Sequence, residues 1–262
     1  MRIVIKVGTS TLAHTGGRLN IRRVELLCKV LSDIKNAGHQ VVLVSSGAIG
    51  MGVGKLGLPG RPQDMPGKQA AAAVGQCELM YTYDRLFSQY SHTVAQILLT
   101  AEDIYHPGHS SHVHDTLTRL LQWGALPVIN ENDAVAIDEI GIHTTIGEND
   151  SLSAIVAKLL QADLLVLLSD IDGLYTADPK KHPDAQLIPV VEQITPEILA
   201  LAGGAGSTLG TGGMATKLKA AQIATEAGVD MVIANGETPE ILYDIVEGKA
   251  VGTRFKGNEV LV

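Results

Sequence analysis

Short strand-like apolar runs alternate with longer stretches of helical periodicity through most of the chain, and this alternation constrains the fold most. The apolar runs cover residues 2–7, 40–45, 93–99, 126–130, 163–168 and 229–234. Several have apolar side chains on both faces, as central strands of parallel sheets do. Helical periodicity covers residues 20–37, 67–89, 110–123, 150–161, 214–227 and 238–247. The pattern predicts an α/β protein with an open, mostly parallel sheet and helices on both faces.

Residues 135–146 differ from this pattern, because apolar and polar side chains alternate there on either side of Gly141. That alternation predicts a hairpin beside the main sheet. The sequence has no linker rich in proline, serine or charge and no internal repeat. We therefore expect a single domain spanning residues 1–262.

Composition excludes several classes of protein. Hydrophobic residues make up 45% of the chain and charged residues 18%, which is typical of a globular protein with a large core. The net charge of −8 and the aromatic content of 3% argue against nucleic-acid binding. Because no apolar run reaches the roughly 18 residues of a membrane span and the N-terminus lacks a signal-peptide core, we expect a cytoplasmic protein without a membrane partner. Cys28 and Cys77 are expected to be free thiols.

Glycine is over-represented, with 28 residues, where average usage of about 7% would give roughly 18. Many of them gather in residues 47–60 and 203–213. Such clustering indicates backbone that bends sharply or lies close to a ligand. Residues 52–57 match G-x-G-x-x-G, but they lie well past the preceding strand and are followed by Pro59, so a dinucleotide site is not expected there. The G-x-x-x-x-G-K-[ST] pattern is absent from the sequence.

The second glycine cluster runs directly into a predicted helix that begins at Met214. Free backbone N–H groups at a helix N-terminus favour anions, and Lys217 lies one turn into the helix, within reach of a bound phosphate. The alternative is a surface loop with a solvated lysine. Lys6 lies within an apolar strand, where its charge is costly to bury unless it meets an anion or extends to solvent. Both outcomes remain open for Lys6.

Polar residues follow several of the predicted strands, and the carboxyl ends of parallel strands share one edge of a sheet. The Ser45–Ala48 turn either holds a carboxylate or caps the next helix. Residues Asn130–Asp133 either bind a polar ligand or form a solvated turn. Asn149 and Asp150 either belong to the site or cap a helix, and Ser169–Asp170 either grips a nucleotide or forms a turn.

Four histidines, His106, His109, His112 and His114, suggest a zinc site at first sight. No cysteine completes a usual ligand set, and Pro107–Gly108 indicates a loop. We expect these histidines to be exposed residues of a loop or a helix start, and no metal site is predicted.

Taken together, six segments resemble the amino-acid kinase family, and within it the members that phosphorylate glutamate. The segments are IVIKVGTS, LVSSGAIGMG, INENDAV, GENDSLSA, LLSDIDGLYTADP and TGGMATKLKAA. The resemblance spans essentially the whole chain and implies an α/β/α sandwich. It also implies ATP-dependent phosphorylation of the side-chain carboxylate of L-glutamate to L-glutamyl 5-phosphate, the first step of proline biosynthesis.

The resemblance assigns roles to residues by position. Lys6 and Lys217 would stabilise the phosphoryl group in flight, and Asp150 would orient these lysines. The implied glutamate-binding residues are Ser46, Gly47, Asp133 and Asn149. The implied ATP-binding residues are Lys6, Gly8, Ser169, Asp170, Thr211, Gly212, Gly213, Met214, Ala215, Thr216 and Lys217.

The resemblance also implies a wider organisation. A lobe of approximately residues 1–150 would bind glutamate and a lobe of approximately residues 151–262 would bind ATP, with Mg²⁺ held mainly by the ATP phosphates. Feedback inhibition by proline, a homo-dimer or homo-tetramer, and transfer of the product to glutamyl-phosphate reductase are implied in the same way. The chain is expected to carry the catalytic domain without a C-terminal PUA domain, and the hairpin at residues 138–146 is longer than in many relatives.

Overall fold

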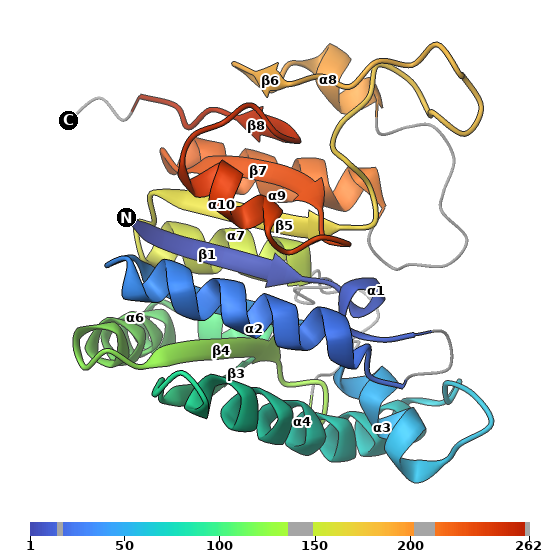
Figure 1. Ribbon diagram of the computed structural model, residues 1–262, viewed down its shortest axis with the longest axis vertical. Coiled ribbons are helices and arrows are strands. Elements are labelled where there is room, and N and C mark those ends of the chain that lie inside the picture. Colours follow the sequence, from blue (N-terminus) through green and yellow to red (C-terminus); the bar gives the residue numbers. More distant parts are fainter. Residues whose placement is uncertain (15–17, 136–148, 202–212, 260–262) are drawn as a thin grey trace.

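Strands from across the sequence combine into one eight-stranded sheet in the computed structural model, which describes residues 1–14, 18–135, 149–201 and 213–259 (Figure 1). The strands are β1 (Arg2–Val7), β2 (Gln40–Ser45), β3 (Val94–Leu99), β4 (Leu126–Glu131), β5 (Leu164–Ser169), β6 (Val190–Val191), β7 (Asp230–Asn235) and β8 (Thr253–Phe255). Their order is β3-β4-β2-β1-β5-β7-β8-β6. All neighbours pair in parallel except β7 and β8, which are antiparallel. The expected open, mostly parallel sheet is confirmed.

Each apolar run identified in the sequence forms a strand, with ends within one residue of the expected ones. β6 and β8 were not predicted, because two or three residues are too few to show a periodicity. Thr253 in β8 anchors this end of the sheet. Its hydroxyl accepts a hydrogen bond from the backbone N–H of Leu174 at 2.8 Å and donates one to the carbonyl of Ile188 at 2.6 Å.

Helices cover both faces of the sheet (Figure 1). They are α1 (Thr9–Leu12), α2 (Ile21–Asn36), α3 (Ala48–Leu56), α4 (Met65–Ser88), α5 (Ala101–Tyr105), α6 (Pro107–Gln122), α7 (Asn149–Leu159), α8 (Pro196–Ala200), α9 (Met214–Glu226) and α10 (Ile241–Val246). All six predicted helices are present, although α10 is shorter than expected. The interpretation of Pro107–Gly108 as a loop was wrong: Pro107 begins α6, because proline is compatible with the first turn of a helix. The predicted hairpin at 135–146 lies almost entirely outside the described residues.

The alternation of side chains along β1 separates two hydrophobic clusters. Ile3 and Ile5 pack on the face covered by α2, α4 and α10. Val4 packs on the opposite face, covered by α6, α7 and α9. Lys6 has the same parity as Val4, so this lysine leaves the strand towards α7 rather than towards α2. The strand therefore determines which helix the lysine meets.

The glycine cluster at 47–60 was expected to form backbone that bends sharply or lies close to a ligand. The first alternative is wrong for the centre of the cluster, because α3 is a helix. Gly47 does adopt a left-handed conformation before it, with φ of 105°. Within α3, Gly52 lies against the backbone of α4, and a Cβ there would come within 1.8 Å of the carbonyl oxygen of Ala71. Gly75 of α4 makes the reciprocal approach, with a Cβ position 1.7 Å from the carbonyl oxygen of Ala48. These glycines allow two helices to touch backbone to backbone.

Both cysteines are free, as expected. Cys28 is buried in α2, and its burial raises the pKa of the thiol, whereas Cys77 is exposed on α4. Within the described ranges, no helix combines the length and the apolar character that crossing a bilayer requires.

Replacing Gly75 with alanine should destabilise the protein by about 1–3 kcal/mol or more, because the new methyl group forces α3 and α4 apart. Gly60→Ala is the matched control, since a Cβ at Gly60 meets nothing within 4 Å; the control should stay within about 0.5 kcal/mol of wild type. Urea unfolding of both variants measures the difference. Equal stability of the two variants would contradict the close approach of the helices.

Candidate active site

The carboxyl ends of the parallel strands bring separate sequence segments to one edge of the sheet. Lys6 lies near the end of β1, Ser46 follows β2, Asn130 lies near the end of β4 and Ser169 ends β5. Strands β4, β2, β1 and β5 are consecutive in the sheet. The polar groups that the sequence placed at strand ends therefore do lie along one edge.

Asp150, in the first turn of α7, is the centre of the charged cluster and is 1% exposed. Its Oδ1 lies 2.6 Å from Nζ of Lys6, and its Oδ2 lies 3.2 Å from Nζ of Lys217. The side chain of Lys6 is 12% exposed and that of Lys217 is 5% exposed. One carboxylate thus holds together two lysines that are more than two hundred residues apart in sequence, which leaves a net charge of +1 on the three groups.

Two opposing effects act on the ionisation of Asp150. Burial alone would raise the pKa of its carboxyl group, but the charges of Lys6 and Lys217 and their hydrogen bonds outweigh burial and hold the pKa below its ordinary value. The carboxylate is therefore ionised at neutral pH.

Helix α9 supplies Lys217 and a second contact to the same carboxylate. The hydroxyl of Thr216 lies 3.2 Å from Oδ2 of Asp150 and 2.8 Å from the carbonyl oxygen of Gly213, and it can donate its hydrogen to either of them. Gly213 is the N-cap of α9, so the backbone N–H groups of Met214 and Ala215, in the first turn, have no acceptor within the helix. The combination of helix N-terminus, dipole and buried lysine favours an anion such as a phosphate.

A chain of side-chain amides begins at Asn149, the residue before Asp150 in α7. Asn149 Nδ2 donates to Ser46 Oγ at 2.8 Å and to Asn130 Oδ1 at 3.1 Å. Asn130 Nδ2 in turn donates to Oε1 of Gln76, on α4, at 2.9 Å. Oδ1 of Asn149 is buried and has no hydrogen-bond partner among the described residues. A buried acceptor of this kind is suited to a donor supplied by a ligand.

The turn after β2 is held from both sides. Gly47 is the N-cap of α3 without a side-chain capping bond, so the capping alternative for Ser46 does not apply, and its hydroxyl instead meets Asn149. Ser45 Oγ lies 2.9 Å from the hydroxyl of Tyr83, which is buried in α4. Helix α4 therefore contacts the site at two points: Gln76 bonds Asn130, and Tyr83 bonds Ser45.

Asp133 lies in the turn that follows β4. Burial raises the pKa of its carboxyl group, and the nearby charge of Arg61 only partly opposes this effect. A cationic ligand group beside Asp133 would lower that pKa again and would be stabilised in return.

Ser169 and Asp170 end β5 beside β7. The Ser169 hydroxyl donates to Asp170 Oδ1 at 3.1 Å, and the backbone N–H of Gly236 donates to the Ser169 carbonyl at 2.7 Å. Gly8, which follows β1, is the N-cap of α1, and a Cβ there would lie 3.5 Å from Nζ of Lys6. Thr211 and Gly212, expected to bind ATP, lie outside the described residues.

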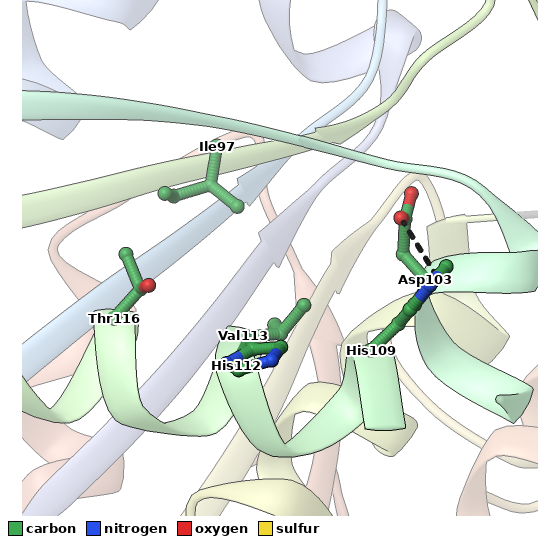
Figure 2. A pocket seen from close by; sticks show the side chains of 6 residues that line it. All are labelled: Ile97, Asp103, His109, His112, Val113 and Thr116. Atoms are coloured by element: carbon green, nitrogen blue, oxygen red, sulfur yellow. Dashed lines mark ion pairs between the residues drawn. The ribbon is translucent and has the colours of Figure 1, made fainter. Parts of the chain in front are cut away.

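The histidines lie apart from this cluster, on α6 and at its N-cap. His109 Nδ1 is 4.0 Å from Oδ1 of Asp103, and both residues line a cavity of about 360 Å³ (Figure 2). Figure 2 shows His109, His112, Val113 and Thr116 along α6, with Ile97 of β3 on the opposite side of the cavity and His109 directed towards Asp103 of α5. No group of three or more metal-ligating side chains occurs within the part of the chain that the structure describes.

Gln76 and Tyr83 are the members of the site region that sequence analysis missed. A signal was present for Gln76: it occupies a position on the same helical face as Ala72, Leu79 and Tyr83, all of them buried. A polar side chain at an apolar position of a helix indicates a specific polar contact.

Comparison with known proteins identifies the family and confirms the fold. Residues 1–235 match the amino acid kinase family. The chain is 54% identical over 254 residues to glutamate 5-kinase from Clostridium perfringens (strain 13 / Type A), covering 97% of this chain and 94% of that one. It is 56% identical over 253 residues to glutamate 5-kinase from Clostridium tetani (strain Massachusetts / E88), covering 97% and 93%. The structure of carbamate kinase from Giardia lamblia bound to AMP-PNP shares the fold, with a TM-score of 0.70, 19% identity and 98% of each chain covered.

Acid titration of Asp150 should be visible in the stability of the protein. Because its pKa is lower in the folded state than the unfolded value of about 3.9, Asp150 contributes stability above that pH and loses it as the pH falls through the folded pKa. At neutral pH, Asp150→Asn removes the carboxylate that Lys6 and Lys217 share and should cost about 3–5 kcal/mol.

Urea unfolding between pH 3 and pH 7 measures the free energy of unfolding of wild type and variant. The gap between these two free energies should narrow as the pH falls. Asp184→Asn, which removes an exposed carboxylate from a turn, controls for the change in net charge. A gap that stays constant over this range would show that Asp150 does not titrate as described.

Proposed function

This chain belongs to the amino acid kinase family, and we propose that it is a glutamate 5-kinase, which transfers the γ-phosphoryl group of ATP to the side-chain carboxylate of L-glutamate and forms L-glutamyl 5-phosphate. The observation that carries the proposal is the convergence of Lys6 and Lys217 on buried Asp150. This cluster lies between the turn after β2 and the N-terminus of α9. Identities of 54% and 56% to glutamate 5-kinases along nearly the whole chain support the choice of substrate.

Lys6 and Lys217 are the proposed catalytic cations. Phosphoryl transfer requires in-line positioning and neutralisation of charge on the equatorial oxygens of the transferred group. Asp150 holds both ammonium groups through its two oxygens and so fixes their separation before substrates bind. Preorganised charges of this kind act without reorganisation during the reaction.

The proposed glutamate subsite is formed by Ser46, Gly47, Asp133 and Asn149. Asp133 is suited to the substrate ammonium group, since the charge of Arg61 only partly offsets the effect of burial on its half-buried carboxylate. The turn at Ser46 and Gly47 presents a hydroxyl and backbone donors to a carboxylate. The accepting carboxylate has an ordinary pKa of about 4.3 and is already ionised at neutral pH, so the reaction needs no general base.

ATP is proposed to bind along β5 and the N-terminus of α9. Gly8, Ser169 and Asp170 would line this subsite, together with the segment from Thr211 to Lys217. The first turn of α9 would bind phosphate oxygens through its free N–H groups. The N-terminal part of the chain, approximately residues 1–150, thus holds glutamate, and approximately residues 151–262 hold ATP.

Mg²⁺ is proposed to accompany ATP and to be held mainly by its phosphates. Both oxygens of Asp150 already face lysines, so this carboxylate is poorly placed to serve as a metal ligand. When bound, the ion would neutralise part of the phosphate charge.

The remaining parts of the proposal follow from family membership. The enzyme would act in the cytoplasm at the first step of proline biosynthesis, and glutamyl-phosphate reductase would consume its product. Inhibition by proline and assembly into a homo-dimer or homo-tetramer belong to the same proposal.

A substrate panel tests the function directly. The protein with ATP and Mg²⁺ should release ADP with L-glutamate and form a hydroxamate when hydroxylamine traps the acyl phosphate. Acetylglutamate, aspartate, carbamate and UMP serve as the alternative acceptors of sister kinases. Turnover of one of these acceptors without turnover of glutamate would refute the proposed substrate.

Lys217→Ala should lower kcat by on the order of 100-fold or more, because it removes a charge that faces the transferred phosphoryl group. The KM for glutamate should change little. Lys219→Ala, an exposed lysine two residues along the same helix, is the matched control. Unchanged kcat in a folded Lys217→Ala protein would remove Lys217 from the transition state.

A further inference from the structure

Gln76 is a polar side chain on the buried face of α4, and it is 8% exposed. Its Oε1 accepts a hydrogen bond from Asn130, while its Nε2 is buried without a hydrogen-bond partner among the described residues. A leucine or methionine would fill this position without the cost of burying an amide. Packing alone therefore does not account for the glutamine.

The hydrogen bond from Asn130 gives the amide chain a direction. In the observed direction Gln76 supplies the acceptor, and the Asn130 amide turns its nitrogen towards α4 and its oxygen towards Asn149. Asn149 must then direct its nitrogen into the chain, where it donates both to Asn130 and to Ser46. The carbonyl oxygen of Asn149 is left as the buried, unpartnered atom.

An amide can be reversed by rotating its last bond, so the chain has two possible directions. In the opposite direction, Asn149 would present an NH₂ donor in place of its carbonyl oxygen. That donor would suit a carboxylate and would disfavour an ammonium group. The Gln76 amide can be reversed in the same way, so it permits either direction, and in each of them it supplies the hydrogen-bonding partner that Asn130 has on α4.

We propose that Gln76 is a positioning residue: through Asn130 it holds the Asn149 amide in place, and in the observed direction of the chain Asn149 accepts a hydrogen bond from the α-ammonium group of the substrate. The identity of that substrate rests on the proposed function. At neutral pH both carboxylates of glutamate are ionised, so its ammonium group is the substrate's only hydrogen-bond donor. Gln76 thus contributes to selecting an α-amino acid over the corresponding dicarboxylate.

Gln76→Met tests the proposal, because methionine has nearly the same length but no oxygen. The KM for glutamate should rise at least tenfold, while kcat and the KM for ATP stay within twofold of wild type. Glutarate, which is glutamate without its ammonium group, should inhibit the variant and the wild type with similar inhibition constants. Gln76→Glu keeps an acceptor oxygen for Asn130 and should hold the KM for glutamate within threefold of wild type.

Cys77→Ser, at the next and exposed position of α4, is the matched control and should leave all these constants unchanged. A KM for glutamate within twofold of wild type in Gln76→Met would overturn the proposal. So would a parallel loss of glutamate and glutarate binding, which indicates general repacking. If Gln76→Met does not fold, Gln76→Asn replaces it, since the shorter amide cannot reach Asn130. Its KM for glutamate should rise in the same way, while kcat and the KM for ATP stay near the wild-type values.

A second measurement does not depend on activity. In a double-mutant cycle of urea unfolding, Gln76→Met and Asn149→Ala should be non-additive, because both residues belong to one hydrogen-bond chain. Additive effects would overturn the coupling between α4 and Asn149. Absence of glutamate phosphorylation by the wild-type protein would instead refute the proposed function, and this cycle would still decide the role of Gln76.

Discussion

The buried carboxylate of Asp150 is the interaction on which the rest of the site depends. Two ammonium groups this close to one another would repel strongly in a poorly solvated environment, and each would be costly to desolvate alone. A single carboxylate that contacts both offsets these costs and joins β1, α7 and α9 at one point. The cluster retains one positive charge, so an anionic ligand is attracted even though the whole chain carries −8.

The second constraint is the direct contact of α3 and α4. Gly52 and Gly75 remove the side chains that would separate these helices, and Gly75 immediately precedes Gln76. The contact fixes the position of the start of α3 relative to α4, and with it the position of the turn at Ser46. Part of the glycine enrichment therefore serves helix packing rather than flexibility or direct contact with a ligand.

An element of this structure can be predicted from the sequence when enough consecutive residues carry its pattern. The central strands are apolar on both faces over about six residues, and their bounds could be predicted almost to the residue. Short β6 and β8 carry no such pattern, and α3 was missed because its glycines have low helix propensity that tertiary contact overrides. Strand ends and a helix start made Lys6, Asp150 and Lys217 candidates, and the family resemblance assigned their roles. Their meeting at one carboxylate depends on the topology of the sheet. The link from Gln76 to Asn130 spans 54 positions, and no local pattern reports it.

Asn149 and Asp150 are consecutive residues in the first turn of α7, and they face different partners. Neighbouring helical side chains point about 100° apart, so one turn of backbone directs an amide towards Ser46 and a carboxylate towards the two lysines. A small rotation of this turn would shift both side chains together. The binding of a ligand beside Asn149 and the binding of a ligand beside the two lysines would then be thermodynamically linked. If one ligand ordered the turn, the other would bind more tightly, by the same free energy in either order of addition.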